Sequence, residues 1–435
     1  MTGAATLESP RTAAPRGTPR LLGPGGADLS RYVLAHGPLP YRDGLTEEIG
    51  AAGLTGRGGA AFPAAVKMTA VARQAGGKVV VANGAEGEPA SHKDKQLLWL
   101  APHLVLDGLQ LAAHAVGARR AVLYVHRHDQ LERLLAAALA ERAAAGADRV
   151  AVELVPAPHR FLAGEESALV SRVGGGLARP TFKHPPVFER GVGGLATLVQ
   201  NVETLAHVAL IARYGAAWFR EVGTAAEPGS MIVTAHSADG VSRVREVPIG
   251  APIADVLGLA RAPAQAVLTG GYHGAWIPAH LALRLPLANA ALRPRGGAAG
   301  AGVLAALPPD RCGLAETARV LRYLAAESAG QCGPCLNGLP RIAAVFSALA
   351  RPHLGRGGHP GRRGLDDLER WAGLVTGRGA CHHPDGTVRL VRSALAVFSS
   401  EIDGHLRGRC TADPAGAPFL PVPARSAPLA RRDWR

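Results

Sequence analysis

The alternation of short β-branched runs with stretches rich in alanine and leucine, between about residues 29 and 214, limits the fold of this chain most. The pattern predicts strands at 78–82, 121–125 and 150–155, and helices at 102–118 and 130–145. Strands that alternate with helices form βαβ units around a mostly parallel sheet. Such sheets bind phosphate-bearing ligands at the carboxyl ends of their strands, so a binding site is expected there.

Two further regions follow the predicted parallel sheet. Residues 229–282 predict a small α+β module, with strands at 231–235, 243–247 and 266–269 and a helical stretch at 252–260. After a looser Pro/Gly/Ala segment, residues 300–408 predict a helical bundle with helices at 314–328, 335–350, 366–375 and 388–406. The Pro- and Gly-rich residues 1–28 are predicted to be a disordered arm, and residues 409–435 a tail.

Charge and composition narrow the function. The formal net charge is +14, but the arginines are scattered and aromatic residues make up only 4%, which argues against nucleic acid as a partner. An arginine-rich surface could instead dock an acidic partner protein. No run of about eighteen apolar residues lacks charges, and the N-terminus does not resemble a secretory signal. We therefore expect no direct membrane span and a cytoplasmic location, with any membrane association made through partners.

A glycine-rich segment at 53–63 precedes a helical run through Lys67. Glycines let the backbone approach an anion closely, and a helix N-terminus offers free N–H groups and a favourable dipole. A structural turn explains the same glycines equally well. Lysine occurs at only five positions, 67, 78, 93, 95 and 183, in a chain that otherwise uses arginine. This choice weakly marks positions that need a compact ammonium group.

Three polar segments lie among apolar sequence. The strand at 79–82 runs into Asn83, Glu86 and Glu88, which form either a polar site or an ordinary charged loop. Residues 161–169 place Glu165 and Glu166 where a helix begins, a position that also complements the helix dipole. Residues 198–205 hold a cluster of Asn201, Glu203 and Thr204. Each segment is ambiguous when taken alone.

The cysteines indicate a metal or redox centre. Their number, five, is odd, and Cys332 and Cys335 lie in a Gly/Pro loop between two predicted helices, about forty-five residues before Cys381. Thiolates at such spacing can share one metal centre. Buried free cysteines are the alternative. Zinc is a second alternative, because three thiolates and one imidazole satisfy its tetrahedral geometry.

Taken together, in this order and at these separations, the four segments and the cysteines resemble the family of NADH dehydrogenase (respiratory complex I) flavoprotein subunits. Its members are also called 51-kDa or F subunits and include diaphorase relatives; the resemblance covers about residues 32–406. It implies an α/β fold with a Rossmann-like FMN-binding domain at 29–214, a β-grasp (soluble-ligand-binding) domain at 229–282 and a helical iron–sulfur domain at 300–408. It also implies FMN and a [4Fe–4S] cluster as cofactors.

The implied activity is NADH oxidation, in which hydride passes to FMN and single electrons leave through the cluster. The acceptor would be a redox partner protein, either ferredoxin-like or a complex I-type subunit. The resemblance places FMN against the glycine-rich loop, the end of the first strand and the two later segments. The implied cofactor-binding residues are Gly56, Arg57, Gly58, Gly59, Phe62, Lys67, Asn83, Glu86, Glu88, Glu165, Glu166, Asn201 and Thr204, with Glu88 also catalytic beside the nicotinamide.

The implied cluster ligands are Cys332, Cys335 and Cys381. Ala329 occupies the position of the family's first cluster cysteine, so a fourth ligand would be water, His382, His383 or Cys312. Cys410 is expected to be uninvolved. Zinc at this site remains open.

Several positions depart from the family pattern. The family's Asp, Gly, Tyr and Asn are replaced by Ala85, Ala61, Phe161 and Gln200, and its aromatic residues by Ala70 and Val187. The loss of these aromatic residues leaves fewer side chains to stack against the nicotinamide and adenine rings of NADH. One alternative is therefore a degenerate flavin- or metal-binding subunit without NADH oxidation. Another is a diaphorase module for a different dehydrogenase, such as a hydrogenase or formate dehydrogenase.

Overall fold

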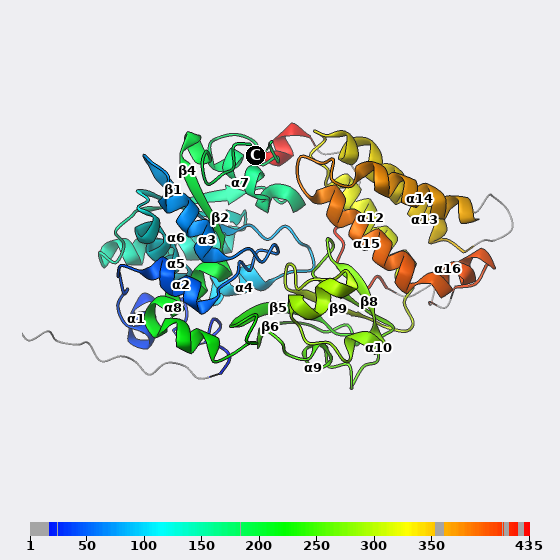
Figure 1. Ribbon diagram of the computed structural model, residues 1–435, viewed down its shortest axis with the longest axis horizontal. Helices are drawn as coiled ribbons and strands as arrows, with labels where there is room; N and C mark the ends of the chain where they lie inside the picture. Colours follow the sequence, from blue (N-terminus) through cyan, green and yellow to red (C-terminus); the bar gives the residue numbers. More distant parts are fainter. Residues whose placement is uncertain are drawn as a thin grey trace, which may run out of the picture.

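The computed structural model describes residues 17–23, 25–182, 184–352, 361–410, 412, 417–424 and 430–435. Three regions lie along its longest axis (Figure 1). The first contains a parallel sheet of four strands in the order β3-β2-β1-β4. The strands are β1 (Lys78–Gly84), β2 (Arg120–His126), β3 (Val152–Ala157) and β4 (Ala196–Asn201). The predicted parallel sheet is confirmed.

Helices cover both faces of this sheet because successive strand residues point to opposite sides. Val80 and Ala82 belong to the large core formed with α5 (Pro102–Val116) and α8 (Val202–Arg220), whereas Val79 and Val81 belong to the smaller core under α7 (Glu166–Val173). The helices of this region are α1 (Leu29–His36), α2 (Leu45–Ala52), α3 (Ala64–Ala72), α4 (Lys93–Leu100), α5 (Pro102–Val116), α6 (Asp129–Ala144), α7 (Glu166–Val173) and α8 (Val202–Arg220).

The second region is a five-stranded mixed sheet in the order β6-β5-β9-β7-β8. Only the β5–β9 pair is parallel, as in a β-grasp fold. Its strands are β5 (Ser230–His236), β6 (Ser242–Pro248), β7 (Ala266–Thr269), β8 (Ala275–Pro278) and β9 (Val303–Leu307). Its short helices are α9 (Ile253–Leu257), α10 (Ala279–Ala282) and α11 (Asn289–Leu292).

The central strand β9 lies inside the range 300–408 that was predicted to be helical, so that boundary is wrong. All five of its residues are buried. A short apolar run rich in alanine cannot be told from a helix by periodicity, and its partners in β5 and β7 are distant in sequence.

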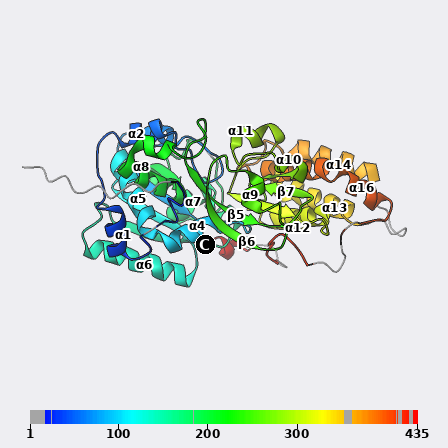
Figure 2. The same ribbon diagram turned by 90° about the horizontal axis from the view of Figure 1, so that it is seen from below.

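The third region is helical and lies at the far end of the molecule in both views (Figures 1 and 2). It contains α12 (Gly313–Ala326), a π-turn (Pro334–Gly338), α13 (Leu339–Leu349), α14 (Gly361–Val375), α15 (His383–Val397) and α16 (Ser399–Leu406). The predicted single helix at 388–406 is two helices, because Phe398 leaves helical geometry and packs its ring 5.3 Å from that of Trp276. Among the described helices, none is long and apolar enough to cross a membrane.

The predicted arm at 1–28 is wrong where the structure describes it; residues 1–16 lie outside the described part. Arg20 and Leu21 are buried. The Arg20 guanidinium donates to the carbonyl of Trp218 at 2.9 Å, and both backbone N–H groups donate to the Glu246 carboxylate at 2.7 Å. This segment therefore joins the end of α8 to strand β6.

The predicted tail at 409–435 also packs where it is described. The Glu316 carboxylate accepts the backbone N–H groups of Phe419 and Leu420 at 3.1 and 2.9 Å. The side chain of Trp434 is fully buried, and its carbonyl accepts from the Ala178 N–H at 2.7 Å. The C-terminus thus lies between the first and third regions (Figure 1).

Candidate functional site

The glycine-rich loop lies against the end of β4. The Arg57 N–H donates to the Thr204 hydroxyl at 2.9 Å, and a Cβ added to Gly58 would lie 3.3 Å from Cβ of Asn201. Gly59 has a φ of +110°, which L side chains rarely adopt. The N–H groups of Gly58 and Gly59 bond to no other described residue. The loop therefore presents two backbone donors beside α3, as an anion site requires.

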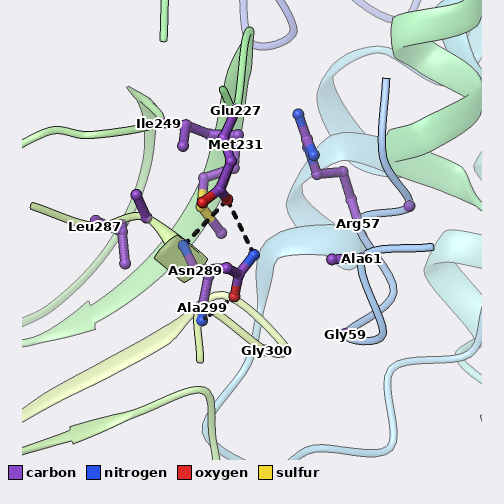
Figure 3. A pocket seen from close by; sticks show the side chains of 12 residues that line it. Arg57, Gly59, Ala61, Glu227, Met231, Ile249, Leu287, Asn289, Ala299 and Gly300 are labelled. Atoms are coloured by element: carbon purple, nitrogen blue, oxygen red, sulfur yellow. Dashed lines mark hydrogen bonds between the residues drawn. The ribbon is translucent and has the colours of Figure 1, made fainter. Parts of the chain in front are cut away.

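The side chain of Arg57 holds this loop against the second region. It is buried, and its guanidinium donates to the carbonyls of Ser230, Pro228 and Thr55 at 3.3, 3.5 and 3.0 Å. A shallow hollow separates the other side of the loop from the second sheet (Figure 3). Its lining includes Gly56, Gly59 and Ala61 on one wall and Glu227 and Asn289 on the other. The Phe62 side chain is 53% exposed.

The ends of β1 and β4 lie side by side, because Asn83 and Asn201 are register partners. The Asn201 amide donates to Asp94 at 2.8 Å, and the Lys93 ammonium contacts Asp94 and Glu203 at 2.7 and 2.8 Å. All three charged side chains are buried. Burial alone would lower the pKa of Lys93, but the two carboxylates raise it above its usual value. This ion network holds the ends of β1 and β4 and the start of α8 together beneath the glycine-rich loop.

Glu86 and Glu88 are both buried and both hydrogen-bonded to other protein groups. Glu86 accepts from the Ser91 hydroxyl at 2.5 Å and from the Asp94 N–H at 3.2 Å. Burial, and then the charge of Asp94, raise its pKa.

Glu88 accepts from the N–H groups of Tyr272 and Ala90 at 2.7 and 3.2 Å. Burial raises the pKa of Glu88 to about 7. A Cβ on Gly271 would lie 2.5 Å from its carboxylate, so the loop after β7 closes tightly around Glu88.

The segment before α7 completes the site. The Lys67 ammonium contacts Glu166 at 2.5 Å and the Val199 carbonyl at 2.9 Å, which joins α3, α7 and β4. The Asn83 amide donates to the Gly164 carbonyl at 2.9 Å. Glu165 caps α7 by accepting from two backbone N–H groups. The four segments singled out in the sequence therefore meet at one edge of the sheet.

The sequence analysis did not assign several residues that shape this site: Lys93, Asp94, Glu203 and Tyr272. The rarity of lysine was the one signal for Lys93, and none marked Tyr272, which contributes only its backbone. Gln200, noted only as a departure, is buried, and its Nε2 has no hydrogen-bond partner among the described residues. An unbonded buried donor beside Asn201 suits a ligand that carries acceptor oxygens.

The three predicted cluster cysteines line one small hollow. Its lining is Leu162, Pro180, Ala329, Gly330, Gln331, Cys332, Cys335, Ala380 and Cys381. Burial raises the pKa of Cys335, and the nearby thiols of Cys332 and Cys381 raise it further. Three adjacent thiols in such a hollow are suited to a centre that carries positive charge. Leu162 comes from the first region, three residues before Glu165.

None of the three side chains considered as a fourth ligand lines this hollow. His383 donates from Nε2 to the Leu324 carbonyl at 2.8 Å and accepts at Nδ1 from His273 at 2.9 Å, so both of its nitrogens are used. The His382 side chain is 88% exposed. Cys312 lies instead with His405 and Cys410. Among the described residues, Cys332, Cys335 and Cys381 do not form a group as tight as a single zinc ion needs.

Phe161 links the two sites. Its N–H donates to the buried Glu327 at 2.9 Å, and its ring packs edge-on against His273 with centroids 4.7 Å apart. It also contacts the rings of Tyr323 and His383. The ring of Phe161 therefore packs in the contact between the first region and the other two regions.

Comparison with known families gives two matches at the expected places. Residues 49–210 match the Nuo51 FMN-binding domain, and residues 315–405 match the NADH-ubiquinone oxidoreductase-F iron–sulfur binding region. Together they show a flavoprotein of the NADH dehydrogenase F-subunit type, with an FMN-binding domain and a [4Fe–4S] region. The resemblance to this family that was inferred from the sequence is confirmed.

Individual relatives agree with this assignment. The chain is 28% identical to the F 2 subunit of NADH-quinone oxidoreductase in Rhizobium meliloti (strain 1021), over 89% of this chain and 96% of that protein. It is 29% identical to the F subunit of NADH-quinone oxidoreductase in Mycobacterium tuberculosis (strain CDC 1551 / Oshkosh), over 85% and 84%. A solved structure of an NAD⁺-reducing [NiFe]-hydrogenase in the H₂-reduced state matches with a TM-score of 0.77 and 30% identity. That match covers 85% of this chain and only 63% of the hydrogenase chain.

Proposed function

We propose that this chain oxidises NADH at an FMN held on the first region and passes the electrons through an iron–sulfur centre to a partner protein. The observation that carries the proposal is the meeting of four separate polar segments at the carboxyl edge of one parallel sheet. The cysteine hollow begins at Leu162, three residues from that edge. The segment from Leu162 to Glu165 would therefore contact both the proposed FMN site, which accepts two electrons, and the proposed cluster site, which carries one.

The residues at the sheet edge fit FMN. The free N–H groups of Gly58 and Gly59 and the ammonium of Lys67 would receive its phosphate, and Gln200 offers a buried donor for an oxygen. Asn201 and Thr204 act mainly by positioning the loop, because their polar atoms bond to Asp94 and Arg57. When bound, FMN supplies the ability to accept two electrons together and to release them singly.

Glu88 is the proposed catalytic residue. Two backbone N–H groups fix its carboxylate, and its pKa of about 7 means that it changes charge near neutral pH. NADH becomes positively charged at its nicotinamide as hydride leaves. An ionised carboxylate beside that ring would stabilise the developing charge.

Cys332, Cys335 and Cys381 would hold the cluster, with a non-protein ligand at the corner where Ala329 stands. We propose that the acceptor is an acidic redox protein or a subunit of a larger complex, since the chain carries a net charge of +14. A cytoplasmic location, with membrane association only through such a partner, is part of the proposal.

Anaerobic purification followed by a visible spectrum, iron analysis and addition of NADH tests the proposal. We expect a yellow-brown protein that contains FMN and iron and bleaches when NADH is added. A protein that binds FMN but does not bleach would overturn the NADH step and favour the degenerate subunit. The departures at Ala85, Ala70 and Phe161 would then explain the loss.

A further inference from the structure

A second group of metal-ligating side chains lies elsewhere in the helical region, apart from the cluster cysteines. Cys312, Glu401, His405 and Cys410 each offer one ligand atom, and these atoms all lie within 4.8 Å of one another. From these residues we infer that the chain binds one zinc-type divalent ion here, which ties α16 to the start of α12. Neither the proposed NADH oxidation nor the family matches assign this site.

The geometry is close to that of a tetrahedral ion. Zinc binds sulfur at about 2.3 Å and nitrogen or oxygen at about 2.0–2.2 Å, so its ligand atoms lie roughly 3.3–3.8 Å apart. Sγ of Cys312 is 3.8 Å from Nε2 of His405. Movements of about 1 Å would therefore close the site around an ion.

Chain topology brings the ligands together. Cys312 is the N-cap residue of α12, and its sulfur accepts from the Ala315 N–H at 3.2 Å. Glu401 and His405 are four residues apart on α16, so they lie on the same face of that helix. Cys410 follows the end of α16 and is exposed. The site is thus nearly closed but has one solvent-facing ligand through which an ion can enter.

The hydrogen bonding of His405 favours metal binding through its other nitrogen. Its Nδ1 contacts the Leu349 carbonyl at 3.3 Å, which places the proton on Nδ1 and leaves the Nε2 lone pair directed at the other three ligand atoms. Metal-bound histidines are commonly oriented by such a hydrogen bond from the opposite nitrogen.

The carboxylate of Glu401 is placed to act as one of the four ligands. One carboxylate oxygen accepts from the Gly313 N–H at 3.2 Å. The other, Oε1, is shielded from solvent and receives no hydrogen bond from an N–H or O–H group of the described residues. The Cys312 thiol hydrogen-bonds to this carboxylate, and a bound metal ion would take the place of the thiol proton.

The ligand types select the ion. Two thiolates and an imidazole favour zinc over magnesium, calcium or manganese, which prefer oxygen ligands. Four protein ligands leave no open coordination position, so the ion would be structural. Binding would release the thiol protons and contribute to folding stability.

The test is metal analysis of the full-length protein purified anaerobically without chelators. We expect one zinc per chain beside the iron of the cluster. Cys410→Ser, which changes an exposed side chain, should lose the zinc and leave iron and FMN unchanged. Cys332→Ser is the matched control, and it should lose iron and keep zinc.

Cobalt provides a second readout that does not depend on the metal present at purification. Protein stripped of zinc should bind one Co²⁺ and show the intense visible absorption of a tetrahedral thiolate site. Glu401→Gln, which retains an acceptor for the Gly313 N–H, should weaken cobalt binding at least tenfold. Absence of both zinc and cobalt binding would overturn the inference. So would equal zinc in Cys410→Ser, or a mass loss of two hydrogens that reveals a Cys312–Cys410 disulfide.

Discussion

The flavin side and the cluster side of this molecule are built in opposite ways. At the sheet edge, the polar side chains bond to one another, and Lys93 with Asp94 and Glu203 forms a buried ion network without any ligand. At the cysteine hollow, Cys332, Cys335 and Cys381 lie close together, the other described residues that line it are uncharged, and one corner is only the methyl group of Ala329. The protein therefore completes the flavin site itself, whereas the cluster site is completed by its cofactor.

The largest expected effect is the complete loss of the cluster in Cys332→Ser. A hydroxyl is a poor replacement for a thiolate ligand, and only three cysteines are available. The visible absorption of the cluster and its iron should disappear while FMN remains bound. The cofactor-free variant should unfold within about 0.5 kcal/mol of the cofactor-free parent, because the half-buried thiol contributes little to the fold. Retention of iron would show that the ligand assignment is wrong.

A matched substitution on the flavin side should instead damage the fold. Lys93→Met leaves Asp94 and Glu203 buried without their cation, which should lower the free energy of unfolding by about 3–5 kcal/mol. Denaturant titration measures this change. Lys78→Met is the control, since Lys78 makes no ion pair with another described residue and should unfold close to the parent. Equal midpoints for the two variants would contradict the comparison.

Glu88→Gln should separate catalysis from binding on the flavin side. We expect flavin reduction by NADH to slow at least about tenfold, equivalent to about 1.4 kcal/mol, while FMN stays bound. Because the pKa of Glu88 is raised to about 7, the parent rate should increase as pH rises through that value and the carboxylate ionises. The variant should lose this step in the pH profile.

Two controls keep that experiment interpretable. Glu153→Gln changes an exposed carboxylate paired with Arg120 and should leave both rate and pH profile unchanged. The amide that Glu88→Gln introduces could also bring its NH₂ group against a backbone donor, so the thermal midpoint must be compared. An unchanged rate in a stable Glu88→Gln protein would remove Glu88 from the mechanism.

The same contrast explains what the sequence could predict. Gly58, Asn83, Glu166 and Thr204 stand out because glycines and polar residues interrupt apolar runs, and a parallel sheet must bring its strand ends to one edge. The sequence therefore predicted which segments meet, although not that Lys93 joins them. The cofactor-binding and catalytic roles assigned to residues at the sheet edge stay predictions.

Contacts between distant segments were beyond sequence reasoning. Cys312 and His405 are 93 positions apart, and nothing in the local sequence marks the two as neighbours. Strand β9 and the buried Trp434 likewise depend on partners elsewhere in the chain. In each case tertiary packing, not local pattern, decides the outcome.

The smallest expected effect comes from restoring a cysteine at position 329. This change tests most directly whether the cluster site lacks one protein ligand. Ala329→Cys adds a fourth thiol to the lining of the hollow, at a residue only 9% exposed. Because the cluster would then have a protein ligand on every iron, its loss in air should slow several-fold, as followed by the decay of its visible absorption. Ala380→Cys is the matched control, because Ala380 lines the same hollow beside Cys381 and adds a thiol at a different place. If both variants slow the decay equally, the corner at Ala329 is not special. If neither does, the cluster is already completed by a ligand that the three cysteines do not reveal.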